Sequence, residues 1–252
     1  MNFNDLFQAS GTRISTNGIN VYFSDIEIPI VQLLEKHTIV VGCALNLRNE
    51  AIIKSLSQKK IKSCIVLDKI EIHKSKKFYE KLNSAFLPWD VFIDELPEPF
   101  YTIDLTPPHH KNTESIRVFG VKATQYTTGQ NPALHHKFLV FCDINIDGEV
   151  APKTVVTGSF NFSKNATFSR ENIVVIEDEY TAETFYDEWA RCFLFSESIS
   201  NYNVSNITPE FIKTKGFHEL VKLNIEENDN LETEAEKHQN MRDFYNGAHE
   251  KF

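Results

Sequence analysis

The stretch from Leu134 to Asp178 constrains the fold of this chain more than any other part of the sequence. It contains three short apolar runs that are rich in β-branched or aromatic residues and bounded by polar ones: Phe138–Cys142, Thr154–Val156 and Ile173–Ile176. Runs of this length and composition predict β-strands. A polar loop, 145–153, joins the first two runs, so we expect them to pair as neighbouring strands of one sheet.

Polar side chains stand at the facing ends of these two predicted strands. His135 and Lys137 begin the first strand, and because strand side chains alternate between faces, both point one way while His136 points the other. Ser159 and Asn161 end the second strand and share a face by the same rule. If the strands pair, one small surface holds an imidazole, an ammonium, a hydroxyl and a carboxamide. This set suits a phosphodiester, since imidazole can attack phosphorus and the other groups can hold anionic oxygens.

The order of these residues carries a family resemblance. His-x-Lys, an apolar strand, and then Gly-Ser-x-Asn-Phe with Glu-Asn further on resembles the phospholipase D superfamily and its HKD motif. The clear resemblance covers 134–178, and a weaker one, by pattern only, covers 21–68. A single motif in a short chain is most similar to the bacterial endonuclease branch of that superfamily.

The resemblance implies a role for each site residue. His135 would attack phosphorus and form a phosphohistidine intermediate, which water later hydrolyses. Lys137 would bind the phosphate oxygens as a point charge. Ser159 and Asn161 would donate hydrogen bonds to the same oxygens. Glu171 would bond the other nitrogen of His135 and so fix its tautomer.

A second histidine is needed to protonate the leaving oxygen, and in the family it comes from a second motif. This chain has one complete motif. The simplest solution is a homodimer in which the two motifs face each other across a two-fold axis, so that His135 of the partner subunit is the acid. The two imidazoles would then share one proton. This mechanism requires no metal and no cofactor.

Two positions depart from the simple pattern. The family places an Asp five residues after the Lys, where this chain has Cys142; Asp143 comes one place later and would point to the opposite face. His109-His110-Lys111 is also His-x-Lys, but no Gly-Ser-x-Asn accompanies it. A loop is its favoured interpretation, and a degenerate second motif is the alternative. No Asp, Glu or Cys lies at metal-site spacing around either His-His pair, so no metal site is expected.

Charge and hydropathy limit the class of protein. The net charge is −9, which argues against a general nucleic-acid coat. Residues 197–252 hold 11 acidic and 6 basic residues, so that 24 acidic and 20 basic residues remain in 1–196, and a local basic cleft is compatible with that balance. No apolar run approaches the roughly 20 residues that span a membrane. The N-terminal sequence is unlike a signal peptide, so we expect a cytoplasmic protein with four buried thiols rather than disulfides.

The remaining periodicity defines the fold class. Apolar runs predict strands at 18–24, 38–45, 61–67, 91–93 and 116–120, and amphipathic runs predict helices at 26–36, 48–60, 74–86 and 180–195. Strands that alternate with helices predict parallel pairing among the first three strands. We therefore expect an α/β fold with a mixed, mostly central β-sheet flanked by helices on both faces. The expected domains are a catalytic domain at 1–196 and a small acidic C-terminal appendage at 197–252.

The sequence thus predicts a metal-independent phosphodiesterase, with an endonuclease as the favoured activity. The expected partners are nucleic acid, DNA before RNA, and a second copy of the chain, with no membrane. The same four groups would also serve a lipid phosphodiester, so a phospholipase or phosphatidyltransferase is the alternative enzyme. The non-enzyme alternative is a catalytically inactive nucleic-acid-binding scaffold of the same fold, which Cys142 favours slightly.

Overall fold

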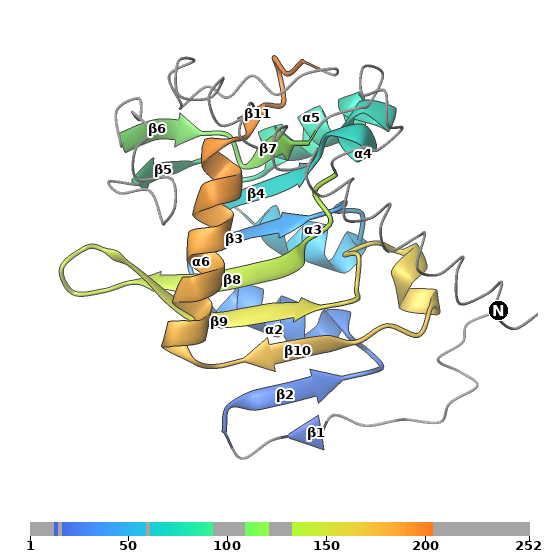
Figure 1. Ribbon diagram of the computed structural model, residues 1–252, viewed down its shortest axis with the longest axis vertical. Helices are drawn as coiled ribbons and strands as arrows, with labels where there is room; N and C mark the ends of the chain where they lie inside the picture. The colour runs from blue at the N-terminus through green and yellow to red at the C-terminus, as the bar shows by residue number, and fades with distance from the viewer. Residues whose placement is uncertain (1–12, 15–16, 59–60, 93–108, 121–132, 204–252) are drawn as a thin grey trace, which may run out of the picture.

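The structure is a computed structural model that describes residues 13–14, 17–58, 61–92, 109–120 and 133–203. Its centre is a nine-stranded sheet with the strand order β1-β2-β10-β9-β8-β3-β4-β7-β11 (Figure 1). The strands are β1 (Arg13–Ile14), β2 (Ile19–Tyr22), β3 (Ile39–Ala44), β4 (Lys62–Asp68), β7 (Ile116–Phe119), β8 (Lys137–Ile144), β9 (Val150–Gly158), β10 (Ile173–Ile176) and β11 (Glu197–Ser198).

The sheet is mixed. Only β3–β4 and β4–β7 pair in parallel, and the other neighbours in the nine-stranded sheet are antiparallel. The expected neighbours β8 and β9 pair as predicted, and their pairing is antiparallel. The prediction of parallel pairing was wrong for β2, because β8 occupies the position beside β3 and β2 pairs instead with β10.

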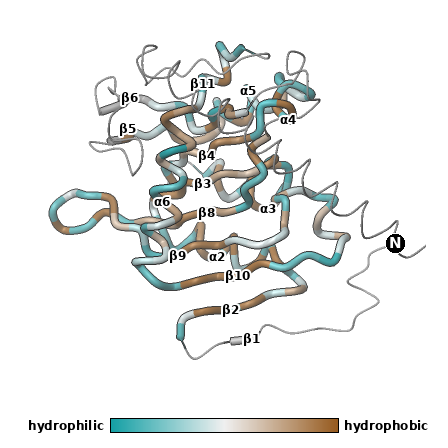
Figure 2. Tube along the Cα trace, viewed as in Figure 1, coloured by the Kyte–Doolittle hydropathy of each residue, from teal (hydrophilic) through white to brown (hydrophobic). Residues whose placement is uncertain are grey.

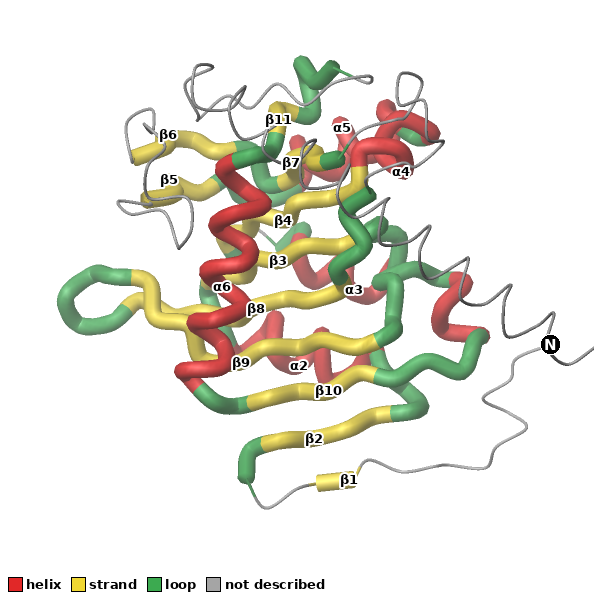
Figure 3. The backbone as a smooth tube through the Cα atoms, in the orientation of Figure 1, coloured by secondary structure: helices red, strands yellow, loops and turns green. Residues whose placement is uncertain are grey.

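Helices cover both faces of the sheet (Figure 3). One face carries α6 (Glu179–Leu194), whose Trp189 and Phe193 pack on the inward residues of β3, β4 and β8. The other face carries the remaining helices, of which α2 and α3 contact each other. These are α2 (Glu27–Lys36), α3 (Glu50–Leu56), α4 (Lys69–Lys74) and α5 (Lys76–Ala85), and a short 3₁₀ turn spans Asn165–Phe168. The α/β architecture expected from the sequence is confirmed.

The middle parts of the central strands β3, β4 and β8 are mostly apolar (Figure 2). Every residue of β3 is buried, because helices cover both of its faces. Such strands form continuous apolar runs rather than alternating patterns. This explains why β3 and β4 were visible in the sequence. No helix in the described part of the chain combines the length and the apolar character needed to cross a membrane.

Three sequence predictions need correction or restriction. His109–Thr113 forms strand β6, paired with β5 (Trp89–Phe92), rather than a loop. The predicted helix 74–86 is confirmed as α5, but a separate short helix, α4, precedes it and was not predicted. The predicted boundary after residue 196 falls inside the sheet, because β11 pairs with β7. Residues 204–252 lie outside the described residues, so the C-terminal appendage stays a prediction.

Candidate active site

The sheet brings the two halves of the motif to one edge, at the right in Figure 1. Strand β8 begins there, and β9 ends there, because Phe138 pairs with Thr157 and the two strands are antiparallel. Strand β10 also begins there, since Ile173 pairs with Gly158. The segments that carry the polar residues are therefore neighbours across three strands.

His135 and Lys137 are in direct contact at this edge. Lys137 Nζ lies 3.1 Å from His135 Nδ1 and 3.4 Å from Nε2, and it donates a hydrogen bond to the backbone oxygen of His135 at 2.9 Å. His135 is exposed, while Lys137 is half-buried. The two side chains thus share one face of the chain, with the imidazole open to solvent.

The second half of the motif is tied to β10. Ser159 N donates to Asn172 O at 3.0 Å, and Asn172 N donates to Ser159 Oγ at 3.0 Å. The Ser159 hydroxyl in turn donates to the Glu171 carboxylate. The resemblance implied a bond from Glu171 to His135, whereas the hydrogen bond that the described structure gives this carboxylate comes from Ser159.

Electrostatics connect the two halves. Burial lowers the pKa of Lys137, and the Glu171 carboxylate opposes that shift by raising it. Glu171 therefore acts on Lys137 as well as on Ser159. The chain of interactions runs from the imidazole through the ammonium to a carboxylate and a hydroxyl.

Gly158 permits this close approach of β9 and β10. Its φ is +152°, and a Cβ built there would lie 2.2 Å from Asn172 O. That oxygen belongs to the backbone and cannot move without opening the strand pair. A glycine directly before Ser159 is therefore a requirement of the site geometry.

We expect Gly158→Ala to lower the free energy of unfolding by about 2–4 kcal/mol, through backbone strain and overpacking. The comparison is Gly148→Ala, in the β8–β9 loop, where φ is +86° and no atom lies within 4 Å of the added Cβ. Only conformational strain of about 1 kcal/mol is expected there. Urea denaturation of both variants measures the difference, and equal losses would contradict the proposed clash.

Asn161 lies two residues beyond Ser159, between two buried phenylalanines. Phe160 and Phe162 are both 1% exposed, and Phe162 O accepts hydrogen bonds from Arg48 N and Asn49 N. These contacts fix the backbone on both sides of Asn161. Its Oδ1 is buried and has no hydrogen-bond partner among the described residues. Thr157 and Gly158 complete the strand end, and Phe162 is a packing residue.

The backbone directly before His135 is hydrogen-bonded to a residue of β4 that the sequence analysis did not select. Leu134 N donates a hydrogen bond of 3.0 Å to Asp68 Oδ2, and Asp68 is buried at the end of β4. The other carboxylate oxygen of Asp68 accepts from Ile70 N and Glu71 N and so caps α4. Asp68 with Glu71 three residues later is a helix-start pattern, and it was the signal for α4 that the periodicity search missed.

Cys142, at the position of the family's Asp, is fully buried on the face covered by α6. Burial raises the pKa of its thiol. Asp143 instead accepts a hydrogen bond from His37 Nδ1 at 3.0 Å. Neither Cys142 nor Asp143 is among the contacts of His135 or Lys137. The cysteine at the position of the family's Asp therefore leaves the contact between His135 and Lys137 intact.

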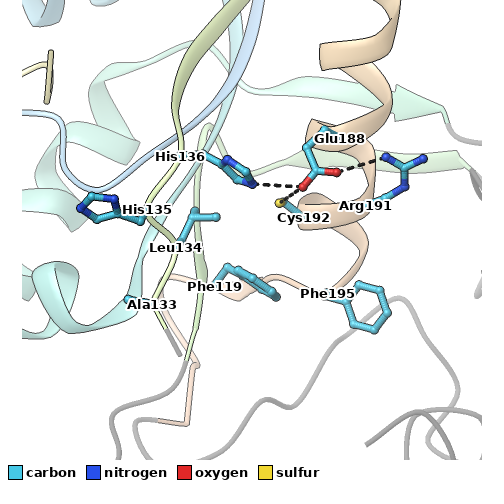
Figure 4. Close-up of a pocket in the computed structure, with 9 residues that line it drawn as sticks. All are labelled: Phe119, Ala133, Leu134, His135, His136, Glu188, Arg191, Cys192 and Phe195. Atoms are coloured by element: carbon cyan, nitrogen blue, oxygen red, sulfur yellow. Dashed lines mark hydrogen bonds and ion pairs between the residues drawn. The ribbon is translucent and has the colours of Figure 1, made fainter. Parts of the chain in front are cut away.

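A pocket of about 600 Å³ opens beside His135. Figure 4 shows His136 pointing toward Glu188 of α6, while His135 points away from it. The lining residues are Phe119, Ala133, Leu134, His135, His136, Glu188, Arg191, Cys192 and Phe195. Sequence reasoning found the two histidines but not the α6 residues, because three strands lie between His136 and α6 along the chain.

Comparison with known proteins identifies the family. The family model described as "Cardiolipin synthase, PLD-like domain" matches residues 19–193. The "Uncharacterized protein L381" of Acanthamoeba polyphaga mimivirus is 30% identical over an alignment of 210 residues, and the match covers 75% of this chain and 70% of that protein. The chain therefore belongs to the phospholipase D-like family, and the resemblance inferred from the HKD pattern is confirmed.

Similar solved structures come from two bacteria. NucT from Helicobacter pylori is 16% identical with a TM-score of 0.45, and the match covers 71% of this chain and 96% of that one. Nuc from Salmonella typhimurium, a phospholipase D family member, is 18% identical with a TM-score of 0.44, covering 71% and 95%.

Proposed function

We propose that the chain is a phosphodiesterase that cleaves nucleic acid, DNA in preference to RNA, as an endonuclease. The observation that carries the proposal is the contact between Lys137 and the exposed imidazole of His135, beside the Ser159–Glu171 pair. In this proposal a nucleophile, a cation and hydrogen-bond donors act together on one phosphate. Family membership supports phosphodiester chemistry.

The reaction divides into two steps. In the first, a nitrogen of His135 attacks phosphorus, a P–N bond forms, and the P–O bond to the leaving group breaks. The leaving oxygen takes the bond's electron pair and a proton from His135 of the partner subunit. In the second step water attacks phosphorus, gives its proton to the now neutral partner imidazole, and releases His135. Metal chemistry is not needed for either step.

Substrate binding rearranges the polar contacts of the free protein. The Lys137 ammonium donates to the ring of His135, which occupies a nitrogen lone pair. An anionic phosphate is the stronger acceptor, so it draws the ammonium from the ring and exposes the nucleophile. When Ser159 likewise turns its hydroxyl to the phosphate, Glu171 becomes free to accept a hydrogen bond from His135. The role implied by the family resemblance is thereby restored in the complex.

Two subunits complete the site in this proposal. His135 and Ser159 are both exposed on the single chain, so the edge is open to a partner. If each site requires both imidazoles, mixed dimers with a His135→Ala subunit are inactive. After complete subunit exchange, activity then falls as the square of the wild-type fraction, to about one quarter in an equal mixture. A linear decrease would mean that each subunit works alone.

The test of the function is cleavage of plasmid DNA, single-stranded DNA and RNA in EDTA, with the molar mass measured on the same sample. We expect DNA cleavage by a dimer, with little dependence on added divalent cation. Phosphatidylglycerol vesicles in a parallel assay test the lipid alternative through headgroup release. Headgroup release without DNA cleavage would replace the nuclease by a lipid enzyme. DNA binding without cleavage of any substrate would favour the scaffold.

A further inference from the structure

His136 of the β8 lead-in and two residues of α6 form a cluster that the proposed reaction does not use. His136 Nε2 lies 3.1 Å from Glu188 Oε1, and Cys192 Sγ lies 3.8 Å from the same oxygen. The three donor atoms lie within 4.8 Å of one another. Glu188 and Cys192 are four residues apart on a helix, which places them on one face.

We propose that His136, Glu188 and Cys192 bind a Zn²⁺ ion. An imidazole nitrogen, a carboxylate oxygen and a thiolate sulfur are the ligand types that zinc accepts together. In a tetrahedral zinc site such donors lie about 3.4–3.6 Å from one another. The two separations measured to Glu188 Oε1 bracket that range, so side-chain adjustments of a few tenths of an ångström are enough for those two contacts.

The surroundings favour coordination over a simple ion pair. All three residues line the pocket of about 600 Å³, which gives an entry path and room for water at the fourth position. Arg191 Nη1 donates to Glu188 Oε2 at 3.1 Å (Figure 4) and thereby leaves Oε1 turned toward His136 and Cys192. Such an outer contact orients a metal-binding carboxylate. The Cys192 proton leaves to solvent when the ion binds.

The ion would join the lead-in of β8 to α6. His136 is adjacent to His135 in the chain, but the two side chains point in different directions in Figure 4. Zinc would therefore fix the backbone that carries His135 without contacting the reacting phosphate. The inference stands independently of the proposed function, because it concerns binding and not cleavage.

The test measures zinc on the full chain. The protein is incubated with Zn²⁺, desalted and analysed for bound metal, and its affinity is measured by competition with a chromogenic chelator. Co²⁺ then replaces Zn²⁺ as a spectroscopic probe. We expect one ion per chain that raises the melting temperature, and a thiolate-to-cobalt charge-transfer band. His136→Ala should weaken binding by about 100-fold or more, the upper end of the loss for an outer-shell partner.

Matched variants separate this site from others. Cys192→Ser should abolish the charge-transfer band, whereas Cys64→Ser, a buried cysteine of β4 outside the cluster, should keep it. His135→Ala should retain zinc. The side chain of His136 is 46% exposed, so its loss should not prevent folding. Zinc absent from the wild type, or equal binding in His136→Ala, would overturn the proposal and leave an ordinary ion pair.

Discussion

His135→Ala is expected to lower the rate of DNA cleavage by about 10⁴-fold or more, because it removes both the nucleophile and the acid supplied to the partner site. The imidazole is exposed, so the variant should fold with wild-type stability. The measurement is single-turnover cleavage of a labelled duplex in EDTA. Quenching with detergent at alkaline pH, where the P–N bond survives, should recover DNA covalently attached to the wild-type chain and none attached to the variant.

The comparison for this variant is His73→Ala, which removes an exposed histidine from the last turn of α4. We expect it to cleave DNA at the wild-type rate. The fold is intact if both variants show the same thermal unfolding. Equal cleavage by both would assign the activity to another group or to a contaminating nuclease, and the phosphohistidine mechanism would be wrong.

The part of the site that could be predicted depends on local rules. Alternation along a strand was enough to place His135 and Lys137 together, and their side chains are in contact. Continuous apolar runs were enough to find β3 and β4, because helices bury both faces of these strands. These features are encoded within a few residues of one another, which is why sequence reading succeeds there.

The part that could not be predicted depends on distant segments. Asp68 holds Leu134 across 66 positions of the chain, and Glu188 meets His136 across 52. The absence of a metal site was inferred from sequence spacing, which cannot report partners that α6 brings onto the sheet. The pairing of β2 with β10 was missed for the same reason, because the periodicity of a sequence defines a strand but not the strand beside it.

Glu197→Ala is expected to lower the free energy of unfolding by about 3–5 kcal/mol, the cost of removing the carboxylate that is paired with a buried ammonium. Lys69 and Glu197 are 0% and 1% exposed and form an ion pair inside the protein. The backbone of Asn203 contacts both charges. Its carbonyl oxygen accepts a hydrogen bond from Lys69 Nζ at 2.8 Å, and its N–H donates to the Glu197 carboxylate at 3.0 Å. Urea denaturation at neutral pH measures the loss. Glu50→Ala, at the exposed pair with Lys164, should cost at most about 1 kcal/mol.

The pH dependence of this variant identifies the cause of the loss. Burial lowers the pKa of Lys69, and Glu197 opposes that shift in the wild type. Without Glu197 the folded-state pKa falls further below the ordinary lysine value of about 10.4. The unfolded chain then binds more protons than the folded one between these two pKa values, so stability must rise with pH through that window. The deficit of Glu197→Ala should therefore shrink from neutral to alkaline pH, whereas a deficit independent of pH would indicate lost packing.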